Sequence, residues 1–76
     1  MRQFLVIIET GEDNFSAYSP DLPGCVATGK TYDEVLKNMS DAILMHLEAL
    51  SESGEPLPET FSLATHIAVP DPSVAF

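Results

Sequence analysis

The order of apolar and polar positions in the first half of the chain predicts a small antiparallel sheet. Residues 4–8 are continuously apolar and mostly branched, which is typical of a central strand. A polar turn over residues 10–14 separates them from residues 15–19, whose alternating character predicts the second strand of a hairpin. Two prolines within residues 20–24 interrupt the pattern, and the apolar stretch at residues 25–28 predicts a third strand.

The second half of the chain predicts one long helix followed by a last strand. Thr31 and Glu34 have the spacing of a capping box, in which the Thr31 hydroxyl accepts from the Glu34 amide and the Glu34 side chain reaches back to Thr31. Apolar residues then recur at steps of three and four until about residue 53, and Gly54 is the expected C-cap. Residues 61–69 alternate between apolar and small or polar side chains, which predicts a one-sided strand.

This order of elements predicts an α+β fold of the type β-β-β-α-β, with one sheet and one long helix packed on one of its faces. A right-handed crossover would place the last strand parallel to the third. The second face of the sheet is left to solvent or to a partner, and we expect an interface there. We assign residues 1–70 to one domain and residues 71–76 to a C-terminal tail.

Composition narrows the classes of function. A chain of 76 residues buries a thin core, so oligomerisation is expected to add stability. Twelve acidic residues against three basic ones give a net charge of -9, which excludes a general nucleic-acid-binding surface and favours basic partners. The longest apolar run is far too short to span a membrane. Cys25 is the single cysteine, so we expect a small buried side chain in a cytoplasmic protein.

The most specific pattern lies between the second predicted strand and the helix. The run Tyr18-Ser19-Pro20-Asp21-Leu22-Pro23-Gly24-Cys25, followed by Thr28-Gly29-Lys30-Thr31 and a helix that opens with Asp33-Glu34, resembles the HicB family of bacterial and archaeal antitoxins. The resemblance covers nearly the whole chain, and its specific part runs from Pro20 to Thr31. The residues that we assign to this structural motif are Pro20, Asp21, Leu22, Pro23, Gly24, Cys25, Gly29, Thr31 and Glu34.

The resemblance implies a fold, a partner and a function. The fold is a partial RNase H-like fold with strand order 3-2-1-4. The partner is a HicA-like toxin, a small basic protein that cleaves messenger RNA and that the antitoxin blocks by direct contact. The implied function is that of a non-enzymatic antitoxin of a type II toxin-antitoxin system, forming a homodimer or homotetramer. Many members carry a C-terminal DNA-binding segment, and we expect this chain to be a short form without one. The alternative is an orphan ligand-binding or regulatory domain with no toxin.

Residues 24–31 also match the P-loop pattern G-x-x-x-x-G-K-T letter for letter. A P-loop requires a parallel strand before its first glycine and a loop whose amides surround the phosphates. Here the preceding segment is interrupted by prolines, and the residues between the two glycines have the character of a strand. We therefore expect no nucleotide and no other cofactor.

Catalytic and metal sites are not indicated by the remaining polar residues. Two-metal nuclease chemistry needs converging carboxylates, and the topology does not predict that Glu9, Asp21 and Glu48 converge. Asp21 is expected to accept hydrogen bonds from its own turn. His46 and His66 lack the paired spacing of metal ligands.

Four residues are candidates for contact with a partner. Glu9, Glu12 and Asp13 lie in or beside the acidic turn, where exposed acids would steer a basic protein toward an interface. His66 is the fourth, and it lies on the polar side of the last predicted strand.

Overall fold

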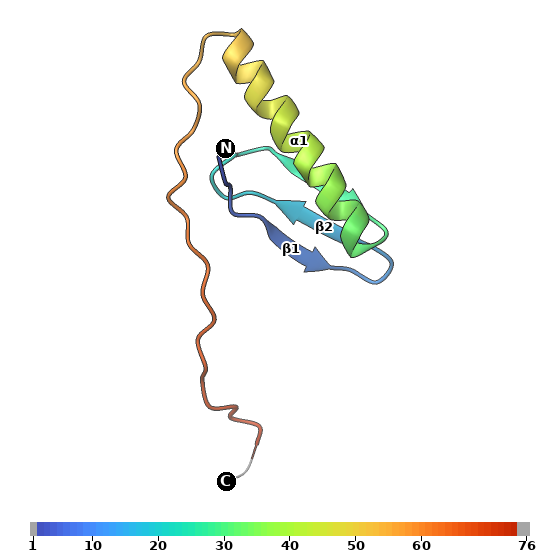
Figure 1. Ribbon diagram of the computed structural model, residues 1–76. Helices are drawn as coiled ribbons and strands as arrows, with labels where there is room; N and C mark the ends of the chain where they lie inside the picture. The colour runs from blue at the N-terminus through green and yellow to red at the C-terminus, as the bar shows by residue number, and fades with distance from the viewer. Residues whose placement is uncertain (1, 75–76) are drawn as a thin grey trace.

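The computed structural model describes residues 2–74 and contains three strands and one helix (Figure 1). The elements are β1 (Ile7–Thr10), β2 (Phe15–Tyr18), β3 (Val26–Gly29) and α1 (Tyr32–Glu52). The strands form one antiparallel sheet in the order β1-β2-β3, and α1 packs on one face of it against β3 and β2. The predicted α+β architecture with one long helix on one sheet face is therefore confirmed.

The predicted hairpin forms, but β1 begins later in the chain than its apolar run suggests. Ile7 pairs with Tyr18 and Thr10 pairs with Phe15, and the Gly11 amide closes the turn by donating to the Asn14 carbonyl at 2.7 Å. Residues 4–6 lie outside the ladder because β2 has already ended opposite Ile7. The prolines that follow β2 explain this end, since a proline removes a backbone donor.

The strand register separates two sheet faces of different character. Ile8, Ala17 and Ala27 are paired across the three strands, so they point to the same side, which is the side of α1. Ala17 is buried there, and its small side chain lets the helix come close. The opposite face, which α1 does not cover, carries three apolar side chains side by side, those of Ile7, Tyr18 and Val26.

The N-cap of α1 is the residue that the sequence indicates, whereas the C-cap is Ser53, one residue before the expected Gly54. The Thr31 hydroxyl accepts from the Glu34 amide at 3.0 Å, which confirms the N-cap. The Glu34 carboxylate, however, accepts from the amide of Lys30 at 3.1 Å rather than from that of Thr31. At the other end Gly54 adopts a φ of +74°, and the next amide, of Glu55, donates to the Leu50 carbonyl at 3.0 Å.

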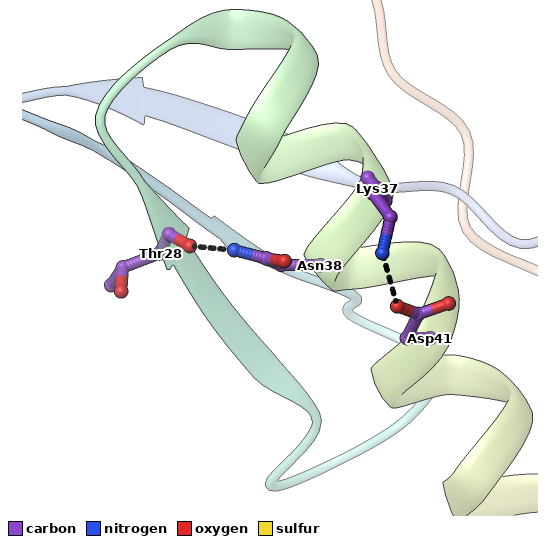
Figure 2. A network of polar contacts seen from close by, with 4 residues as sticks. All are labelled: Thr28, Lys37, Asn38 and Asp41. Atoms are coloured by element: carbon purple, nitrogen blue, oxygen red, sulfur yellow. Dashed lines mark hydrogen bonds and ion pairs between the residues drawn. The ribbon is translucent and has the colours of Figure 1, made fainter.

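The core lies between the sheet and the first half of α1. Its buried apolar residues are Ala17, Leu22, Cys25, Val35 and Met39. A side-chain amide joins helix and sheet at the same level, because Asn38 Nδ2 donates to the Thr28 carbonyl at 2.8 Å (Figure 2). On the outer side of the helix Lys37 and Asp41 form an exposed ion pair at 3.1 Å (Figure 2). No helix within residues 2–74 has the length and apolar character needed to cross a membrane.

The predicted strand at residues 61–69 is wrong for the single chain. Residues 55–74 form neither helix nor strand, and they run as an extended trace past the N-terminus and beyond the sheet (Figure 1). The radius of gyration is accordingly 16.1 Å, whereas a compact domain of this length has about 11 Å. A strand exists only where a neighbouring strand completes its ladder. The crossover parallel to β3 and the fourth position of the order 3-2-1-4 are therefore both absent from the described residues.

Candidate partner-binding surface

The proline-containing loop between β2 and β3 is a structural element. Its two turns are closed by the Leu22 amide, which donates to the Ser19 carbonyl at 3.1 Å, and by the Cys25 amide, which donates to the Leu22 carbonyl at 3.0 Å. They direct Leu22 into the core, where its side chain is fully buried. Pro20 and Pro23 are exposed on the outside of the loop. The most specific part of the sequence pattern thus serves to insert an apolar side chain beneath the helix.

Asp21 lies in the same loop, but its contacts are not local. Its carboxylate is buried and accepts from the Ser62 hydroxyl at 2.6 Å and, at the longer distance of 3.4 Å, from the Ser62 amide. The expectation that Asp21 accepts from its own turn is therefore wrong. Sequence reasoning missed Ser62, because a partner 41 residues away leaves no local signal. The contact ties the start of the C-terminal segment to the loop.

Cys25 is buried directly behind this loop. Burial raises the pKa of its thiol, because an apolar environment disfavours the thiolate. The protonated thiol is a weak nucleophile. Cys25 therefore acts as a small core residue, as the sequence indicates.

The P-loop spacing is explained by packing and capping. A Cβ atom on Gly29 would lie 2.5 Å from the backbone nitrogen of Val35, so only glycine allows α1 to start this close to β3. The Lys30 amide already donates to the Glu34 carboxylate and the Glu34 amide to the Thr31 hydroxyl, so neither amide is free to donate to a phosphate. The residues between the two glycines include β3 itself.

The remaining candidates for chemistry are dispersed. Within residues 2–74, no three His, Cys, Asp or Glu side chains are grouped closely enough to hold a metal ion. His46 is half-buried and lines an open hollow of about 370 Å³ between the loop at residues 21–23 and the prolines that follow α1. His66 is exposed on the C-terminal segment.

Three of the four predicted contact residues lie together. Glu9, Glu12 and Asp13 are all exposed in the β1–β2 hairpin. Within residues 2–74 the ion pair is the one between Lys37 and Asp41, so none of the three hairpin acids is paired with a cation. The structure does not bring His66 to this hairpin, because the C-terminal segment leaves the sheet at its other end (Figure 1). The hairpin acids continue the open face of the sheet, since Glu9 is two residues from Ile7 on the same strand.

The surface is thus apolar at one end and acidic at the other. The apolar end is the row Ile7, Tyr18 and Val26, and the acidic end is the group Glu9, Glu12 and Asp13. We call the two together the open sheet face. An exposed apolar patch bordered by charge has the character of a protein-binding surface.

Comparison with known proteins identifies the family. Residues 4–74 match the family model described as the HicB_like antitoxin of bacterial toxin-antitoxin system. The chain belongs to the HicB-like antitoxin family. A chain of the solved HicA3 and HicB3 toxin-antitoxin complex is 33% identical, has a TM-score of 0.66, and aligns over 78% of this chain and 70% of its own length.

Two further proteins extend the comparison. The N-terminal domain of the antitoxin HicB from Burkholderia pseudomallei is 31% identical with a TM-score of 0.66, over 79% of this chain and 69% of that structure. An uncharacterized 14.9 kDa protein from the rep-hol intergenic region of Haemophilus phage HP1 is 33% identical over 87% of this chain. The HicB-like chain spans half the length of this phage relative.

Proposed function

We propose that this HicB-like chain is the antitoxin of a type II toxin-antitoxin system and that it inhibits a HicA-like, messenger-RNA-cleaving toxin by binding to it. The observation that carries the proposal is the likeness, at 33% identity over 78% of the chain, to a chain from a HicA-HicB complex. In this proposal the protein has no catalytic role, and it acts by covering the toxin surface that RNA would occupy.

The open sheet face is the surface that we assign to the toxin. A protein that binds RNA presents basic side chains, and the hairpin presents Glu9, Glu12 and Asp13 without cationic partners among the described residues. Acids placed in this way steer a basic partner and raise the association rate, while the neighbouring side chains of Ile7, Tyr18 and Val26 supply apolar area to bury.

The test is co-expression with the small basic protein encoded beside this chain, with growth, RNA integrity and co-purification as readouts. We expect the wild-type chain to restore growth and to co-purify with the toxin. The triple variant Glu9→Lys, Glu12→Lys and Asp13→Lys should weaken binding at least about tenfold, since rim charges mainly change the association rate.

A matched control separates position from net charge. Glu48→Lys, Glu52→Lys and Glu59→Lys change the charge by the same amount at exposed positions away from the hairpin, and this variant should protect as the wild type does. Equal loss in both variants would refute the assignment to the hairpin. Absence of rescue and of a complex with the wild-type chain would refute the antitoxin function and favour the orphan regulatory domain.

A further inference from the structure

The C-terminal segment exposes a row of large apolar side chains. Phe61, Leu63, Ile67 and Val69 have exposed fractions between 74% and 97%. They alternate along an extended segment, so all four point to one side of it. We call them the apolar row. Exposed apolar side chains gathered on one side of a strand-like segment mark a surface that binds something.

A sheet edge of matching length is unoccupied. β1 is an edge strand, and its outer backbone groups have no ladder partner within residues 2–74. Phe4, Leu5 and Val6 continue this edge and are half-buried although neither side of them is paired. Residues 4–10 and residues 63–69 each span about 23 Å as strands. An open hollow of about 1110 Å³ lies between residues 2–5 and 60–63.

The other edge of the sheet is less available. The carbonyl of Thr28, on β3, already accepts from Asn38 of α1 (Figure 2). The amide of Lys30, just after β3, donates to Glu34. A strand added at β3 would have to displace these contacts, whereas one added at β1 would displace none.

The chain's own row meets only the start of this edge, where Phe61 and Leu63 line the hollow together with residues 2–5. Ser62 is held by Asp21 and the Pro58 carbonyl accepts from Arg2 at 3.3 Å, so the chain crosses the end of the sheet and then leaves it (Figure 1). A return along β1 would need a sharp turn after Ser62. After Ser62, residues 63–69 contain no glycine, proline, asparagine, aspartate or serine, which are the residues that favour turns.

Charge decides between a second copy and a basic partner. The chain has a net charge of -9, yet residues 61–69 contain no Asp, Glu, Lys or Arg, and neither do residues 3–8 on the receiving edge. A surface built for a basic protein would carry acids. Where two uncharged segments of an otherwise acidic chain meet, repulsion between two acidic copies is avoided.

We propose that residues 61–69 form the fourth strand of a second copy of this chain, added at its β1 edge, and that a two-fold axis makes the exchange reciprocal. Beyond Ser62 the segment runs away from its own sheet (Figure 1), which favours exchange over closure within one chain. Each copy thereby covers the other's apolar row. This inference does not depend on a toxin.

The test uses the full chain alone, in size-exclusion chromatography with light scattering. The wild type should have twice the monomer mass of 8.2 kDa. The variant Leu63→Lys with Ile67→Lys should raise the dissociation constant at least about 100-fold, because the lysines would be buried without partners. Ala64→Lys with Ala68→Lys, on the other side of the same segment, should remain a dimer, and circular dichroism should show α1 intact in both.

Hydrogen exchange of the backbone amides distinguishes strand exchange from other dimers. Amides of residues 63–69 should be protected in the wild-type dimer and exposed in the Leu63→Lys and Ile67→Lys variant. A dimer in which these amides exchange freely would overturn the proposal. A monomeric wild type would overturn it too, and loss of toxin binding in that variant would then assign the apolar row to the toxin.

Discussion

The start of α1 lies close against β3 at Gly29, and the substitution Gly29→Ala tests this contact. The added Cβ would lie 2.5 Å from the nitrogen and 2.9 Å from the Cα of Val35, and 3.0 Å from the carbonyl carbon of Glu34. These are backbone atoms, so no change of rotamer relieves the overlap and α1 must move away from β3. Overpacking of this kind costs about 1–3 kcal/mol. We expect about 3 kcal/mol, at the upper end of that range, because the movement also loosens the buried side chains of Val35 and Met39.

This loss is large for a domain of this size. A free energy of unfolding of about 4–11 kcal/mol is typical of 76 residues, and a loss of about 3 kcal/mol lowers the Tm by roughly 12–24 °C. Thermal and urea unfolding followed by far-ultraviolet circular dichroism measures it. Without the overlap, alanine in place of glycine stabilises by about 0.4–1 kcal/mol through the unfolded state. An unchanged or raised Tm would therefore refute the close approach.

Gly11→Ala is the matched control for this substitution. Its Cβ would lie 2.7 Å from Oδ1 of Asn14, which is the end of a flexible side chain in an exposed turn. That side chain rotates away at little cost, so we expect a change within about 0.5 kcal/mol.

Three further experiments test the N-cap, the core thiol and the long-range anchor. Thr31→Ala should lower the free energy of urea unfolding by about 1 kcal/mol through loss of the N-cap, while Thr31→Ser retains most of it. Cys25 should react with iodoacetamide only as fast as the chain unfolds. Burial raises the pKa of this thiol, so its protonated form stabilises the fold. This stabilisation is complete below the unfolded-state pKa and is lost as the pH rises through the folded-state pKa. Cys25→Ala should abolish this alkaline loss of stability in urea titrations. In a double-mutant cycle, Asp21→Asn and Ser62→Ala should couple by about 1.5 kcal/mol, and additive effects would show that the hydrogen bond contributes nothing.

The elements that the sequence predicts correctly are those whose causes are local. The hairpin follows from a polar turn between apolar segments, and α1 follows from its three- and four-residue periodicity and its cap at Thr31. The strand at residues 61–69 has an equally clear alternation, but alternation shows only that one side of a segment seeks burial. It does not state which sheet, or which copy of the chain, provides the partner.

Residues 24–31 illustrate the same limit for a site. Their spacing is that of a phosphate-binding loop. Whether the segment is interpreted as such a loop or as a connection between β3 and α1, Gly29 and Thr31 are required. Only the three-dimensional context separates them: Gly29 is needed for the contact with Val35, and Thr31 binds the helix's own amide rather than a ligand. A short motif therefore states which residues are constrained, and the surrounding strands and helices decide what constrains them.

Asp21 shows why the structural role of this family motif could not be predicted from the sequence alone. In a proline-rich turn an aspartate is expected to bind its own backbone, whereas here it binds Ser62, at the point where the C-terminal segment passes the end of the sheet. The motif therefore fixes two things at once: Leu22 is inserted into the core, and the departing segment is held at Ser62. Because the apolar row starts beside that anchor, the direction in which it leaves the sheet is set by a residue of the β2–β3 loop. In our proposal that direction presents the row to a second copy of the chain and leaves the open sheet face, on another part of the surface, available to a toxin.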